Sequence, residues 1–162
     1  MGTIVVGTDG SKASNAAVAE AIDLARRLEA KLIVAAVRPP VPDYLGEPLY
    51  QERLSEDLAR ARRALDEARR LVEQAGVEAE YELLEGDPAK EVAKLAEKRD
   101  ADLVVVGTRG IGAVAGSLLG SVSAGVVRRS RRPVVVVREP MERAREEAAE
   151  RQAEQTLGSA PA

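Results

Sequence analysis

The sequence DLVVVGTRGIGAVAGSLLGSVS, residues 102–123, joins a short apolar run to a glycine-rich segment. The run has the length and β-branched composition of a buried strand, and Gly107, Gly110 and Gly120 follow it. Glycines allow backbone N–H groups to close around an anion, because no Cβ keeps the ligand away. A helix is expected to begin near Ser121, and a helix N-terminus offers free N–H groups and a partial positive charge. The segment therefore predicts a phosphate-binding loop at the end of a strand.

Two familiar phosphate motifs do not describe this segment. A Walker A loop is excluded because no Gly-Lys-Ser/Thr follows the glycines. A Rossmann fingerprint is excluded because the glycines come in a different order and lie late in the chain. The alternative interpretation of the local pattern is a flexible glycine-rich turn between a strand and a helix.

The composition limits the classes of function open to this chain. Its 162 residues are enough for one domain, and the core must be aliphatic because Phe and Trp are absent. The absence of cysteine and histidine excludes disulfides, thiol chemistry, zinc–cysteine sites and histidine-based acid–base catalysis. A formal charge of −3 and the lack of an aromatic stacking platform argue against a nucleic-acid partner.

The apolar segments of the chain do not point to a membrane. The N-terminal stretch MGTIVVGTDG lacks the charged and long apolar regions of a signal peptide. No apolar run approaches the roughly 20 residues that a helix needs to cross a bilayer. We therefore expect no membrane partner and a cytoplasmic location.

Apolar runs and helical patterns alternate along residues 1–138. We expect strands at 3–8, 31–37, 77–84, 102–106 and 133–138, and helices at 12–29, 50–75, 88–99 and from about 117 or 120 to 130. Such alternation predicts an α/β fold, with a five-stranded parallel sheet covered by helices on both faces.

The strand order follows from the way such sheets are wound. Right-handed crossovers, with the first three strands wound one way and the last two the other, give the order 3-2-1-4-5. The order then reverses between the first and fourth strands, and ligands bind beyond the carboxyl ends of strands at such a point. Those ends are Gly7-Thr8-Asp9 and Val106-Gly107, so the topology and the glycine pattern indicate the same place.

The segment 139–162 is expected to form a charged helical or disordered tail beyond the domain at 1–138. It is rich in helix-forming residues and in Glu–Arg pairs such as Glu147 with Arg151. It lacks an apolar stripe that could anchor it, so a frayed, solvated helix or disorder is expected. A helix that binds a partner is the alternative.

Several motifs together resemble the universal stress protein family, in its nucleotide-binding branch. The resemblance covers about residues 1–138, and the tail at 139–162 lies outside it. It rests on Gly7-Thr8-Asp9-Gly10-Ser11, Gly86-Asp87-Pro88, the runs at 102–107 and 130–137, and the complete pattern Gly107-x2-Gly110-x9-Gly120-Ser121. That pattern separates the ATP-binding members from those that do not bind. The resemblance implies a Rossmann-like fold of the adenine nucleotide alpha hydrolase-like type.

The resemblance also implies which residues form a site for ATP with Mg²⁺ or Mn²⁺. Thr8 and Asp9 would approach the adenosine and the metal–phosphate region. The backbone of Val37 would lie against adenine, and Val106 and Gly107 would line the ribose side. The phosphates would be held by Arg109, Gly110, Gly120, Ser121, Val122 and Ser123.

The chemistry of Asp9 and Arg109 leaves alternatives open. The Asp9 carboxylate is an oxygen ligand that can meet Mg²⁺, directly or through water, or a ribose hydroxyl. It can equally form an Asx turn that caps the helix beginning near residue 12, and both roles can hold together. Arg109 can pair with phosphate oxygens or remain a solvated loop cation.

These observations favour an ATP-binding stress-response protein that acts as a regulatory module with slow or no hydrolysis. Fast hydrolysis needs a positioned base and charge stabilisation at the γ-phosphate, and Asp9 is the one well-placed acid in the sequence pattern. The alternatives are a weak ATPase or nucleotidyl-transfer enzyme, and a dimeric interaction scaffold with a vestigial pocket.

A homodimer is expected through the strand at 133–138. This apolar strand lies at the edge of the sheet in the inferred order and needs a partner or a cover. Antiparallel pairing of two copies would satisfy it with two-fold symmetry, and the family resemblance implies the same contact. A protein partner is also expected, but the sequence does not identify it.

Overall fold

The computed structural model describes residues 2–108 and 119–158. Within these ranges one five-stranded parallel sheet has the order β3-β2-β1-β4-β5, which confirms the predicted topology. The strands are β1 (Thr3–Gly7), β2 (Lys31–Arg38), β3 (Ala79–Glu85), β4 (Leu103–Gly107) and β5 (Val134–Val137).

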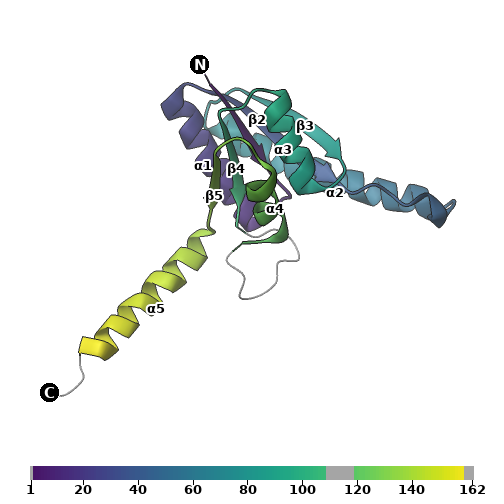
Figure 1. The fold of residues 1–162 in the computed structure, drawn as a ribbon. Coiled ribbons are helices and arrows are strands. Elements are labelled where there is room, and N and C mark those ends of the chain that lie inside the picture. The colour runs from purple at the N-terminus through teal and green to yellow at the C-terminus, as the bar shows by residue number, and fades with distance from the viewer. Residues whose placement is uncertain (1, 109–118, 159–162) are drawn as a thin grey trace.

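Helices cover both faces of the sheet (Figure 1). The helices α1 (Lys12–Leu28) and α2 (Leu49–Gln74) pack on one face, and α3 (Pro88–Lys98) and α4 (Ser121–Arg129) pack on the other. A short 3-10 turn, η1 (Asp43–Leu45), precedes α2. The architecture is therefore the doubly covered α/β arrangement that the alternating pattern predicts, and it is Rossmann-like, as the resemblance implies.

The central strands β1, β2 and β4 carry uninterrupted apolar runs because both of their faces are buried. Val6 lies in the core cluster beneath α1 and α2, whereas its neighbour Val5 lies in the cluster beneath α3 and α4. Both are 0% exposed, and burial of each such side chain stabilises the fold by about 1.5–3 kcal/mol. In the central strand β1, Val5 is in register with Ile33 of β2 and with Val104 of β4.

Local capping residues determine where the helices begin and end. Ser11 caps α1 by accepting a hydrogen bond from the Ser14 N–H at 3.2 Å. Asp87 caps α3 by accepting from the Lys90 N–H at 2.9 Å, and Pro88 is the first helical residue, as predicted. Gly76 follows α2 with φ +66°, the left-handed conformation that glycine adopts without strain.

The first half of α2 leaves two of its large apolar residues partly exposed. Leu54 and Leu58 are only half-buried, and the buried positions begin with Asp57 and Ala61. The reason is length: the 26 residues of α2 span about 39 Å, whereas the eight residues of β2 span about 26 Å. The first part of the helix consequently extends past the sheet (Figure 1).

The segment after β5 is helical. Helix α5 (Pro140–Gly158) leads away from the sheet in Figure 1, and residues 148–158 are exposed. That residues 1–138 form a domain of their own, with this segment as an appendage, stays a prediction. None of the helices in the described ranges is both long and apolar enough to cross a membrane.

Gly107 allows α1 to pass close to the end of β4. A Cβ at this position would lie 2.6 Å from both the carbonyl carbon and the carbonyl oxygen of Ala13. These are backbone atoms in the first turn of α1, so they cannot move aside as a flexible side chain would. The glycine is therefore required by packing between a helix and a strand.

We predict that Gly107→Ala destabilises the protein by about 1–3 kcal/mol, because the added methyl group overpacks a backbone contact. The melting temperature should fall by roughly 3–10 °C. Gly7→Ala at the end of β1 is the matched control, because its Cβ would meet Val92 Cγ2 at an ordinary 3.4 Å. Thermal unfolding followed by circular dichroism compares the two variants. Equal melting temperatures for both would contradict this account of Gly107.

Candidate functional site

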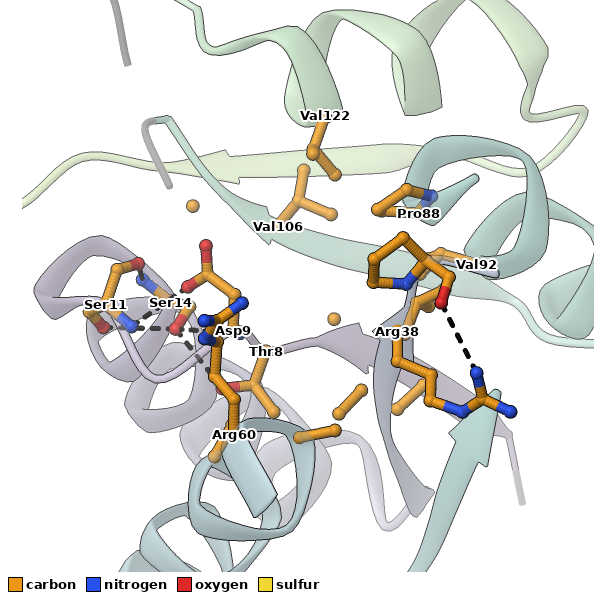
Figure 2. A pocket seen from close by; sticks show the side chains of 18 of the residues that line it. Thr8, Asp9, Ser11, Ser14, Arg38, Arg60, Pro88, Val92, Val106 and Val122 are labelled. Carbon is orange, nitrogen blue, oxygen red and sulfur yellow. Dashed lines mark hydrogen bonds between the residues drawn. The ribbon is translucent and has the colours of Figure 1, made fainter. Parts of the chain in front are cut away.

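A cavity of about 330 Å³ opens beyond the carboxyl ends of β1 and β4, where the strand order reverses (Figure 2). Helix α1 leaves β1 on one face of the sheet, and α4 follows β4 on the other face. The two helices therefore diverge and leave the strand ends open between them. The cavity lies at the place that the topology predicts for a ligand.

One side of the cavity is polar and comes from the turn between β1 and α1. The Ser11 N–H donates to Asp9 Oδ1 at 2.9 Å, which is the Asx turn expected as one of the two roles of Asp9. Ser14 Oγ accepts from the Asp9 N–H at 3.3 Å and lies 3.2 Å from Thr8 Oγ1. The turn is thus held by its own side chains, and these side chains also line the cavity.

The other side of the cavity is apolar. Val92 and Pro88 line it from α3, Val106 from β4 and Val122 from the first turn of α4, and Figure 2 shows these side chains gathered there. A cavity with an apolar side and a polar side suits a ligand that combines a flat apolar ring system with charged groups.

The backbone of Val37 faces this cavity. The ladder between β1 and β2 ends with the bond from the Thr8 N–H to the Ala35 carbonyl at 2.8 Å. β2 continues beyond the end of β1 to Arg38. The Arg38 carbonyl points toward β3, where it accepts a hydrogen bond from the Gly86 N–H at 3.0 Å. Because successive residues of a strand direct their N–H and C=O groups to alternate sides, those of Val37 point to the side on which β1 has ended.

The structure brings most of the predicted site residues together. Those that line the cavity are Thr8, Asp9, Val37, Val106, Gly107, Val122 and Ser123. Gly120 and Ser121 do not line it, although Gly120 is the N-cap of α4 and Ser121 its first residue. Arg109 and Gly110 lie outside the described residues.

The groups predicted to hold phosphates make bonds within the protein. The Gly120 N–H donates to the Thr108 carbonyl, and Ser123 Oγ lies 2.9 Å from the same oxygen. Ser123 is 2% exposed, and its Oγ is also 3.1 Å from the Gly120 carbonyl. These contacts tie the start of α4 to the end of β4.

Sequence reasoning missed the contribution of α2 to the site. Asp57, Arg60, Ala61 and Ala64 of this helix line the cavity. Their spacing places them on one helix face, and a signal was present, because Asp57 interrupts the apolar stripe on that face. Asp57 is 3% exposed and pairs with Arg53 and Arg60.

The acidic residues of the cavity do not form a preformed metal cage. Within the described ranges no group of three or more His, Cys, Asp or Glu side chains could hold a metal ion. Mg²⁺ is commonly held by one or two carboxylates together with the phosphates of a nucleotide. Asp9 at the cavity fits that kind of binding, in which the ligand itself brings most of the oxygen atoms.

Comparisons with known proteins match most of the chain. The model of the universal stress protein family matches residues 1–138. A universal stress protein of Thermus aquaticus is 43% identical over 137 residues, which cover 84% of this chain and 98% of that protein.

Two solved structures show the same fold. A universal stress protein solved in complex with cAMP is 36% identical, has a TM-score of 0.68 and covers 85% of this chain and 97% of its own. A universal stress protein from Lactobacillus plantarum is 27% identical, has a TM-score of 0.75 and covers 85% of this chain and 97% of its own.

Because Asp9 accepts a hydrogen bond in the Asx turn, Asp9→Ala and Asp9→Asn should differ in their free energy of unfolding. Asp9→Ala removes the acceptor for the Ser11 N–H and should lower the free energy of unfolding by about 0.5–1.5 kcal/mol. Asp9→Asn keeps an amide oxygen in the same place and should stay within about 0.5 kcal/mol of the wild type. Urea unfolding measures both. Equal destabilisation by the two substitutions would mean that the charge of Asp9, and not its turn, stabilises the fold.

Proposed function

The chain belongs to the universal stress protein family, and we propose that it binds ATP in the cavity and acts as a nucleotide-dependent regulatory module. The observation that carries the proposal is the cavity itself, which joins an apolar side to a polar turn at the reversal of strand order. The family member solved with cAMP supports an adenine nucleotide as the class of ligand.

The backbone of Val37 supports adenine as the base. Its N–H and C=O groups point to the side on which β1 has ended, and Val37 lines the cavity. A neighbouring donor and acceptor match the edge of adenine, which offers an amino group beside a ring nitrogen. The apolar side chains of Val92 and Val122 would then pack against the ring.

The polar turn at Asp9 supports a divalent cation and phosphates beside the nucleoside. Asp9 would take part in holding Mg²⁺ or Mn²⁺ together with the phosphates, and the bound cation would neutralise their charge. The first turn of α4, from Ser121 onward, would add helix N–H groups and a partial positive charge for the phosphates. Arg109 and Gly110 are proposed to join them, as the family pattern implies.

The chemistry of the lining residues favours binding over rapid turnover. Fast hydrolysis needs a base placed to orient water and charge stabilisation at the γ-phosphate. Of the acids that line the cavity in the described ranges, Asp57 is tied to two arginines and Asp9 holds the turn before α1. We therefore propose slow or no hydrolysis, with a regulatory role that depends on nucleotide occupancy.

ATP binding is tested by filling the apolar side of the cavity. Val122→Phe should lower the ATP affinity at least tenfold, about 1.4 kcal/mol, because the ring would occupy the space of the base. Val127→Phe is the matched control, since Val127 lies on the same helix and is 46% exposed. Titration calorimetry with ATP and Mg²⁺ gives the affinities.

Two further measurements on the wild type accompany this titration. Mass spectrometry of small molecules released on denaturation should find adenine nucleotide, and a phosphate-release assay should find little turnover. Wild-type protein that neither retains nor binds ATP would overturn the proposed function. Rapid phosphate release would instead make the chain an ATPase.

We also propose a homodimer through β5, because this strand forms one edge of the sheet. The Val104 N–H donates to the Pro133 carbonyl and the Thr108 N–H to the Val137 carbonyl, so odd-numbered residues of β5 face β4. The backbone groups of Val134 and Val136 therefore point outward, where a second copy can pair with them.

This alternation makes Val136→Pro a selective test of the dimer. The proline removes an outward N–H and leaves the ladder with β4 intact, so the mass in solution should shift toward the monomer. Val136→Ala keeps that N–H and should stay dimeric. Light scattering at micromolar concentration measures the mass of each variant. A monomeric wild type would contradict the dimer, and a dimeric Val136→Pro would exclude this edge as the contact.

A further inference from the structure

The face of α2 that meets the cavity changes character along the helix. Ala68, Ala64 and Ala61 present small apolar side chains to the sheet and the cavity, whereas Asp57 and Arg60 carry charge. A helix that only covered the sheet would continue its apolar stripe through position 57. The change of character occurs where the helix passes from the core to the cavity, so the charged pair belongs to the cavity.

Asp57 is held between two arginines of its own helix. Its side chain is 1% exposed, Arg53 Nε donates to its Oδ2 at 3.0 Å, and Arg60 Nη1 lies 3.4 Å from its Oδ1. An apolar residue at such a buried position commonly stabilises a fold as well as an ion pair does. Stability alone therefore does not account for a buried aspartate at position 57, whereas its role in orienting two guanidinium groups does.

The two arginines differ in what they face. Arg60 lines the cavity and reaches from α2 toward Asp9 and Thr8 in Figure 2, whereas Arg53 is not among the lining residues. Both side chains are about half exposed, and both contact the same carboxylate. The helix thus offers one guanidinium to the cavity and keeps a second one away from it.

The second arginine that lines the cavity among the described residues is already engaged. The guanidinium of Arg38 forms an ion pair with Glu85, and its Nη1 donates to the Pro39 carbonyl at 3.3 Å. In Figure 2 Arg38 lies across the cavity from Arg60. Of the described residues that line the cavity, Arg60 is the cation on the side of Asp9.

We propose that Arg60 contacts the phosphates of the bound nucleotide and that the buried Asp57 positions it. This inference rests on the proposed function, because it assigns a residue to the same site. The contact with Asp57 uses Nη1, so Nε and Nη2 can meet phosphate oxygens in the paired geometry that guanidinium favours. Arg60 also offsets the repulsion that Asp9 and Asp57 exert on a polyphosphate.

A phosphate contact predicts selectivity and not only affinity. Adenosine has no phosphate, so its affinity should not depend on Arg60, whereas the affinity for ATP should. Loss of a hydrogen bond to a charged group corresponds to a change on the order of 10- to 100-fold. A structural role of Arg60 would instead change the affinities for ATP and adenosine together.

The test compares Arg60→Gln with Arg53→Gln in the full chain. Both substitutions remove one arginine from Asp57 and keep the side-chain length nearly constant, but only Arg60 lines the cavity. Calorimetric affinities for ATP and adenosine are measured for each protein. Arg60→Gln should weaken ATP binding 10- to 100-fold and leave the affinity for adenosine unchanged. Arg60→Lys keeps the positive charge and should restore part of the lost ATP affinity. Arg53→Gln should bind both ligands with wild-type affinity.

A third substitution tests the positioning role of Asp57. Asp57→Asn should weaken ATP binding in the wild-type background and have no further effect in the Arg60→Gln background, because the two residues act as one unit. Additive losses would overturn the positioning role. ATP binding unchanged by Arg60→Gln, or adenosine binding weakened as much as ATP binding, would overturn the phosphate contact alone. Absence of ATP binding in the wild type would overturn the proposed function together with this inference.

Discussion

The site depends on one constraint, which is that the chain winds in opposite directions from two neighbouring parallel strands. β1 leads through α1 to β2 on one side, and β4 leads through α4 to β5 on the other side. Because both crossovers are right-handed, the two helices must lie on opposite faces of the sheet. The strand ends between them cannot be covered by either helix. The cavity is therefore a consequence of the topology, and side chains only decide what it binds.

The same constraint assigns different physical tasks to residues that look alike in the sequence. Gly107 lies in the glycine pattern that predicts a phosphate loop, but its contact with the Ala13 backbone shows that α1 needs it to pass β4. Gly120 has φ −70°, a value open to any residue, and its N–H is bonded to the Thr108 carbonyl. Glycines in such motifs thus serve the packing around the strand ends as well as an approaching ligand.

The sequence predicts the fold well because each strand and helix carries its own local signal. The β-branched runs, the start of α3 at Pro88 and the reversal of strand order could all be read without coordinates, and they indicate the edge of the sheet at which the cavity lies. The contribution of α2 could not be read in this way. Hydrophobic periodicity identifies the face of a helix that packs on a sheet, but it does not show where the helix extends beyond the end of the sheet. Asp57 lies at that boundary, where the apolar face of α2 ends.

The length of α2 links this boundary to function. Covering the sheet requires only the part of the helix from about Ala61 onward, yet the helix begins at Leu49, which is 54% exposed. A solvated helical extension contributes little to stability, since most helical stability in proteins comes from packing of an apolar face. The extension carries Asp57 and Arg60 to the cavity beside the turn at Asp9. A ligand held there would contact elements from both faces of the sheet. Its binding free energy would then add to the stability of the whole domain, since the unfolded chain has no such site.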